Sequence, residues 1–129
     1  MTRMSDVSYH VLGCSFNVMN ELGVGFLEAI YKNALCVSLR RKGFSVEIER
    51  SFKIYFMSEE IGVYRADLIV DNSVIVETKC CSTLLPEHQA QVMNYLKATN
   101  ISEGLLINFG ERTLQYKRLY HPNCNFPSS

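Results

Sequence analysis

Two apolar runs separated by only three residues constrain the fold of this chain most strongly. Residues 68–70 (Leu-Ile-Val) and 74–76 (Val-Ile-Val) are continuously apolar, and the loop between them, 71–73, reads Asp-Asn-Ser. Strands that are covered on both faces have this unbroken apolar character, so the pattern predicts a hairpin inside a covered sheet. A three-residue loop pairs Val70 with Val74 and requires its Asn or Ser to accept the strain of the turn.

The same register gathers charged side chains at one end of the hairpin. Residues two apart on a strand share a face, so Glu77 and Lys79 point the same way, and Asp67 lies opposite Glu77. Two carboxylates about 5 Å apart repel each other unless a cation or a proton lies between them. The pattern therefore indicates a metal site for phosphodiester chemistry. The alternative is a surface hairpin with a Glu–Lys pair and an unrelated Asp.

Composition limits the other classes of function. The 129 residues predict one domain, 1–121, followed by a flexible tail, 122–129. The net charge is zero, so contact with nucleic acid depends on local basic patches such as 40–42 (Arg-Arg-Lys) and 117–118 (Lys-Arg). The five cysteines are an odd number without Cys-x-x-Cys spacing, which argues against a disulfide framework and a structural zinc site.

The chain carries no sign of a membrane association. No apolar run approaches the roughly 20 residues of a membrane span, and the first residues lack the layout of a signal peptide. We therefore expect a cytoplasmic protein.

Periodicity predicts a mixed α/β (α+β) fold, in which helices flank a mixed central sheet. Helical spacing of apolar residues is replaced by alternation from Ser45, and Pro86 is suited to the first turn of a later helix. The stretch 54–57 (Ile-Tyr-Phe-Met) is interpreted as core rather than as an interface, and Cys80 and Cys81 as small core residues. The expected helices cover 6–22, 26–42 and 86–98, and the expected strands 45–56, 62–70, 74–80, 105–109 and 114–120.

Further candidates lie on the expected helices. Glu28 and Tyr31 share a face of the second helix, although a Glu in a first turn also suits the helix dipole. On the third helix Gln91 and Tyr95 are four residues apart, and His88 precedes Gln91 by three. An amide and a phenol on one face can bind phosphate oxygens or orient a catalytic carboxylate, or they can form an ordinary exposed pair.

Six segments together resemble the GxxExxY family of the PD-(D/E)XK nuclease superfamily, from about Val11 to Arg118. The Asp…Glu-x-Lys signature is loose by itself, but the helical Glu, the later Gln-x-x-x-Tyr and the order of elements make the match specific. The segments are GFLEAIY (25–31), YRAD (64–67), ETK (77–79), HQAQ (88–91), NYLKAT (94–99) and GLLINFG (104–110).

The resemblance implies a restriction-endonuclease-like αβββαβ core with an extra N-terminal helix. It implies that Glu28, Asp67 and Glu77 hold one or two Mg²⁺ (or Mn²⁺) ions, with the Thr78 carbonyl as a further ligand, and that Lys79 orients the attacking water. Such hard oxygen ligands suit Mg²⁺. It also implies that Gln91 and Tyr95 lie beside the metal and touch the substrate or the catalytic residues, with His88 as a lesser candidate.

Three hypotheses follow. The first is a metal-dependent nuclease for DNA foremost, or RNA, that acts on ends, flaps or single strands through stacking faces on Tyr31, Tyr64 and Tyr95. The second is a nuclease-derived accessory module, which binds nucleic acid, a partner protein or a second copy of itself without cutting. The third is a protein whose charges pair internally, which predicts a direct ion pair of Lys79 with Glu77 or Asp67.

Overall fold

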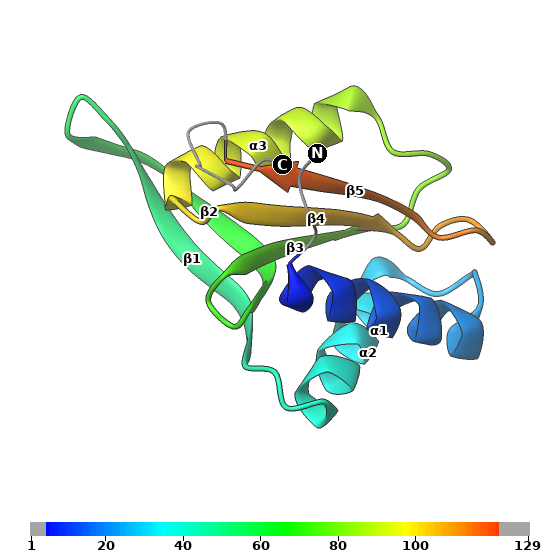
Figure 1. Ribbon diagram of the computed structural model, residues 1–129. Coiled ribbons are helices and arrows are strands. Elements are labelled where there is room, and N and C mark those ends of the chain that lie inside the picture. Colours follow the sequence, from blue (N-terminus) through cyan, green and yellow to red (C-terminus); the bar gives the residue numbers. More distant parts are fainter. Residues whose placement is uncertain (1–4, 122–129) are drawn as a thin grey trace, which may run out of the picture.

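The computed structural model describes residues 5–121 as a five-stranded sheet with helices on both faces (Figure 1). Two helices, α1 and α2, cover one face, and α3 covers the other. The elements are α1 (Asp6–Leu22), α2 (Glu28–Arg41), β1 (Val46–Phe56), β2 (Glu59–Val70), β3 (Val74–Lys79), α3 (Pro86–Thr99), β4 (Glu103–Asn108) and β5 (Gln115–Tyr120). The predicted order of elements and the mixed α/β fold are confirmed, whereas residues 122–129, expected as a flexible tail, lie outside the described part.

The strands follow one another in the sheet in chain order, β1-β2-β3-β4-β5. All neighbours are antiparallel except β3 and β4, which are parallel and are connected through α3. The predicted hairpin register is confirmed, because Val70 pairs with Val74. The left-handed turn positions are Asp71 and Asn72, with φ of 50° and 55°, rather than Ser73.

The two apolar runs are buried on both faces, as predicted. Leu68, Val70, Val74 and Val76 pack in the cluster under α1 and α2, while Ile69 and Ile75 pack under α3. At about 25 cal/mol for each Å² of apolar surface removed from water, these central strands are a main source of stability.

Strand β2 exchanges its faces at Asp67. Tyr64 and Ala66 pack under α3, yet Leu68 and Val70, which continue the same alternation, pack under α1 and α2. The pairing with β1 is interrupted at the same place, since Ile48 pairs with Leu68 and Arg50 with Ala66 while Glu49 and Asp67 are skipped. Glu49 has a φ of 52°, so the irregularity expected near residues 50–51 is centred one residue earlier.

The hairpin of β1 and β2 reaches beyond the helices (Figure 1). Its end exposes Tyr55, Phe56 and Met57, and Met57 retains 82% of its accessible surface. The interpretation of 54–57 as core is therefore wrong for these three residues, because no helix covers this end of the hairpin. Ile54 alone is partly buried, against the α3 cluster.

Candidate functional site

Asp67 and Glu77 lie where β2 and β3 separate. The ladder between these strands ends at the pair Leu68 and Val76, and beyond it the carboxylates take the place of backbone acceptors. The Asp67 N–H donates to Glu77 Oε2 at 2.8 Å, and the Thr78 N–H donates to Asp67 Oδ2 at 2.9 Å. The Thr78 hydroxyl donates to the same Oδ2 at 3.1 Å. Both carboxylates are thus fixed by hydrogen bonds to the backbone, and each has a second oxygen that these bonds leave unused.

Burial and mutual repulsion disfavour the ionised form of Glu77. Burial raises its pKa to about 8, and the neighbouring Asp67 carboxylate adds to the increase, although the Asp67 N–H, the Lys79 ammonium and the Tyr64 hydroxyl act in the opposite direction. At neutral pH this carboxyl therefore retains a proton unless a cation lies beside it.

Glu28 is the first residue of α2, and its charge interacts with the same cluster. Its pKa is raised by partial burial and by Asp67, and is lowered by Lys79 and Lys32. The side chain is exposed and begins the helix, where a carboxylate is stabilised by the helix dipole. Asp67 and Lys79 are therefore close enough to influence both Glu28 and Glu77 electrostatically.

Lys79 does not pair directly with the carboxylates. Between residues 5 and 121 the ion pairs are Lys32–Glu49, Arg50–Glu47 and Lys53–Glu60. The third hypothesis, with its direct ion pair of Lys79 with Glu77 or Asp67, is therefore wrong. Lys79 is a half-buried residue beside the cluster and takes part in none of these ion pairs.

The donor set suits a hard divalent cation in chemical type, because carboxylates and a backbone carbonyl are the oxygen ligands that Mg²⁺ prefers. Within residues 5–121, however, no three His, Cys, Asp or Glu side chains are already placed to hold a metal ion. One oxygen each of Asp67 and Glu77 is engaged by N–H groups, so a cation would be held by the other oxygen of each carboxylate. Burial and the Asp67 carboxylate raise the pKa of Glu77 and of Glu28, so a bound cation would stabilise the ionised form of both side chains.

Tyr31 positions the start of α2 instead of offering a stacking face. Its ring is fully buried and stacks on Phe109, with the ring centres 5.0 Å apart. Its hydroxyl donates to the Gly23 carbonyl and accepts from the Phe26 N–H. The loop before Glu28 is thus tied to the core, so the expectation of an open Tyr31 ring is corrected.

Tyr64 is likewise buried, at 4% exposure, between Phe52 and Tyr95. Its hydroxyl is close enough to Glu77 to influence the pKa of that carboxyl, but it is not in hydrogen-bonding geometry with any described residue. Burial and the carboxylates raise its own pKa, so the phenol stays protonated. The sequence analysis did not identify this buried hydroxyl as part of the cluster, although the position of Tyr64 three residues before Asp67 could have indicated it.

The three candidate residues on α3 differ in burial and in what they contact. Tyr95 is half-buried and stacks on Tyr64 at 3.5 Å, which connects α3 to Glu77 through one ring. Gln91 is exposed and forms no hydrogen bond with the described residues. His88 closes the helix N-terminus, where its Nδ1 accepts from the Leu85 N–H at 3.0 Å. Their proposed roles beside a metal remain predictions.

The loop after Lys79 is held by a residue that the sequence did not single out. Asn108 is fully buried at the end of β4; its Oδ1 accepts from the Cys81 N–H, and its Nδ2 donates to the Cys81 carbonyl. Gly110 allows this loop to approach, since a Cβ there would lie 2.2 Å from the Cys81 carbonyl oxygen. Cys80 is exposed and Cys81 is partly exposed, so the interpretation of both as core residues is wrong.

A mixed sheet with helices on both faces, and carboxylates and a lysine gathered where β3 leaves β2, is the arrangement of a restriction-endonuclease-like domain. The chain belongs to the PD-(D/E)XK nuclease superfamily, whose family model matches residues 5–119.

Comparison with solved structures agrees with this fold. The protein titled "Crystal structure of SSO0001" superposes with a TM-score of 0.55 at 23% sequence identity, over 74% of this chain. The chain spans 50% of the length of that protein, and the low identity supports the fold alone. A comparison with curated proteins finds no match. Within residues 5–121 no helix is long and apolar enough to cross a membrane.

Proposed function

We propose that this protein is a metal-dependent nuclease of the GxxExxY type, which hydrolyses phosphodiester bonds of nucleic acid, DNA foremost. The observation that carries the proposal is the convergence of Asp67, Glu77, Glu28 and Lys79 where β2 and β3 separate, in a chain of a nuclease superfamily. Superfamily membership alone would not suffice, because function resides in sites rather than in folds.

Glu28, Asp67 and Glu77 would hold Mg²⁺ or Mn²⁺, with the Thr78 carbonyl as a further ligand. When bound, the ion supplies an acidified water and neutralises charge on the scissile phosphate. The hydrogen bonds from the Asp67 and Thr78 N–H groups keep the two carboxylates in place before substrate arrives. Such preorganisation lowers the cost of forming the reactive geometry.

Lys79 is assigned the orientation of the attacking water or of a phosphate oxygen. Its ammonium is close enough to lower the pKa of both Glu28 and Glu77, and it is free of ion pairs within residues 5–121. A protonated lysine donates three hydrogen bonds and attracts an anionic substrate. Tyr95 supports Glu77 through Tyr64, and Gln91 is assigned to the substrate side of α3.

A second function, that of an accessory module acting with a partner protein or a second copy, is favoured by one observation. The β1–β2 hairpin exposes Tyr55, Phe56, Met57, Ile61 and Val63 together. Exposed apolar surface of this kind is typical of protein–protein contacts. In this case the carboxylate cluster would bind without cutting.

A cleavage assay separates the two functions. Wild type, Asp67→Asn, Lys79→Met and the exposed control Glu60→Gln are incubated with labelled single-stranded, duplex and flap DNA and with RNA, in Mg²⁺, in Mn²⁺ and in EDTA. The nuclease proposal expects cleavage by wild type and Glu60→Gln that needs metal and is lost in the two site variants. Cleavage that survives in Asp67→Asn would refute the assigned site, and no cleavage of any substrate would favour the accessory function.

A further inference from the structure

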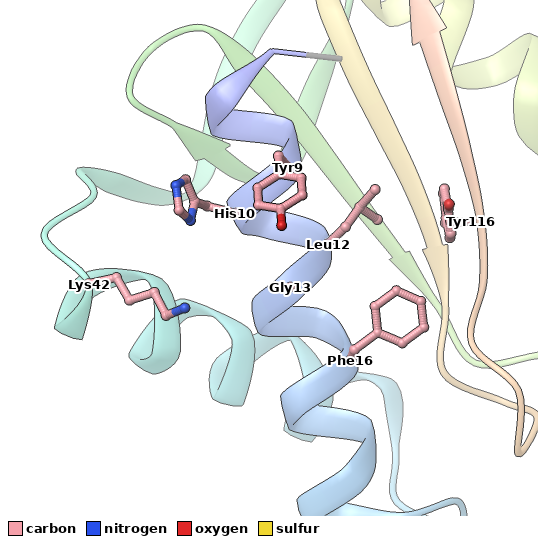
Figure 2. Close-up of a pocket in the computed structure, with 7 residues that line it drawn as sticks. All are labelled: Tyr9, His10, Leu12, Gly13, Phe16, Lys42 and Tyr116. Atoms are coloured by element: carbon pink, nitrogen blue, oxygen red, sulfur yellow. The ribbon is translucent and has the colours of Figure 1, made fainter. Parts of the chain in front are cut away.

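A groove of about 470 Å³ crosses the surface of α1 between the end of α2 and β5 (Figure 2). It is separate from the acidic cluster, because Lys42 follows the end of α2 while Glu28 begins it, and a helix of 14 residues is about 20 Å long. The lining residues are Tyr9, His10, Leu12, Gly13, Phe16, Lys42 and Tyr116.

Three aromatic rings in this groove are open to solvent. Tyr9, Phe16 and Tyr116 retain 67%, 44% and 39% of their accessible surface. Phe16 and Tyr116 form a T-shaped pair with ring centres 6.3 Å apart. In this arrangement the edge of one ring contacts the face of the other, so the contact occupies the face of only one ring. These rings are the exposed stacking surfaces that Tyr31 and Tyr64, both buried, do not provide.

Gly13 leaves the floor of the groove open between the rings. It lies in the middle of α1, where glycine costs about 1 kcal/mol relative to alanine. A Cβ at this position would meet no atom within 4 Å, so neither crowding nor backbone conformation requires glycine there. The missing side chain widens the groove for a flat group next to the helix.

Positive charge borders the groove on two sides. Lys42 lines it, and Arg118 shares the face of β5 that carries Tyr116 because the two residues are two apart. The Arg118 guanidinium donates one hydrogen bond to the Tyr120 hydroxyl and keeps further N–H donors for a phosphate. Asp6, one turn before His10, is the acidic group on this stretch of α1. Lys42 and Arg118, far apart in the sequence, thus border one aromatic surface, whereas Lys117 pairs with Leu106 and lies on the α3 side of the sheet.

We propose that this groove binds a single-stranded segment of nucleic acid, with bases stacked on Tyr9, Phe16 and Tyr116 and phosphates beside Lys42 and Arg118. Aromatic faces interleaved with cations are the means by which proteins hold single strands without reading sequence. The inference builds on the proposed nuclease function, since it names the form of nucleic acid that the chain holds away from the acidic cluster.

The test measures binding without cleavage. Fluorescence anisotropy with a labelled oligothymidylate of about 20 nucleotides in EDTA gives the Kd of wild type, Tyr9→Ala and Gly13→Leu. Gly13→Leu fills the groove while it improves the helix propensity of α1, so a loss of binding in this variant is not a loss of fold. Val37→Ala, which removes an exposed apolar side chain of α2 that does not line the groove, is the control.

We expect Tyr9→Ala and Gly13→Leu each to weaken binding about tenfold, Val37→Ala to leave it unchanged, and Lys42→Ala to reduce its salt dependence. Groove-dependent binding together with an absence of cleavage would leave this inference standing and refute the nuclease proposal. The inference would be overturned if wild type did not bind the oligonucleotide, or if Gly13→Leu and Tyr9→Ala bound it as tightly as wild type does. In that case an apolar segment of a partner protein would be the remaining occupant of the groove.

Discussion

The ionisation of Glu77 makes the stability of the metal-free protein fall as pH rises. The pKa of this carboxyl is about 8 in the folded protein, against an ordinary value of 4.5. Because the folded state favours the protonated form, the contribution is complete below about pH 4.5 and is lost as pH rises towards 8. At about 1.4 kcal/mol for each pH unit, the full difference is about 5 kcal/mol.

Urea unfolding in EDTA, followed by far-UV circular dichroism across this pH range, measures the effect. Glu77→Gln removes the titrating group but keeps an oxygen that can accept from the Asp67 N–H. We therefore expect the free energy of unfolding of wild type to fall by on the order of 2–5 kcal/mol relative to Glu77→Gln between the two pH limits. Glu60→Gln, which replaces an exposed carboxylate, is the matched control for the loss of one acidic group.

Mg²⁺ provides the second half of the test. An ion that binds only the folded state stabilises it by about 2.7 kcal/mol at a hundredfold excess over its Kd. The ion should therefore restore the stability of wild type near pH 8 and have little effect on Glu77→Gln. Parallel pH curves for wild type and Glu77→Gln in EDTA would refute the reasoning, because they would mean that Glu77 ionises without cost.

The remaining predictions concern the residues that hold the site and the exposed hairpin, and each is checked by urea unfolding. Tyr31→Phe removes the hydroxyl that joins Gly23 to Phe26, and should cost about 1–3 kcal/mol of stability and lower any metal-dependent cleavage. Gly110→Ala places a Cβ against the Cys81 backbone and should cost at least about 1–3 kcal/mol, in contrast to Gly13→Ala, which should be neutral or stabilising. Met57→Ser, on the open hairpin, should change stability by no more than about 0.5 kcal/mol, whereas a core position would lose several times as much.

The sequence predicted what local patterns determine. The apolar runs on both sides of residues 71–73 and the turn chemistry between them fix the pairing of Val70 with Val74, so the register followed directly. The same register correctly brought Asp67 next to Glu77. These features depend on residues that are close in the chain, where periodicity and turn preferences are decisive.

Features that depend on distant elements were not predictable in the same way. Whether 54–57 is core depends on whether a helix extends over the hairpin, and α3 does not reach its end. The burial of Tyr31 and Tyr64 depends on Phe109 and Tyr95, which lie far from them in the chain. Tyr31 and Tyr64 were therefore predicted to contact a ligand, whereas in the structure they are buried and support the neighbouring motif residues.

The face exchange of β2 at Asp67 is what would let the carboxylates serve a cation, as we propose. In a regular hairpin, the backbone of each strand would supply the acceptors for the Asp67 and Thr78 N–H groups, and the side chains would alternate into a covered face. Here the pairing omits Asp67 on the β1 side and ends beside it on the β3 side, and the carboxylates accept those hydrogen bonds instead. The left-handed backbone at Glu49 adds to the free-energy cost of this local irregularity.

A variant that restored regular backbone pairing at Asp67 should therefore have a more stable fold and bind metal more weakly. The replacement of Glu49 by glycine relieves the positive φ without restoring this pairing, and it gives up the ion pair of Glu49 with Lys32, which involves an exposed carboxylate and contributes little. Urea unfolding should therefore show a protein at least as stable as wild type, and calorimetry should show unchanged metal binding.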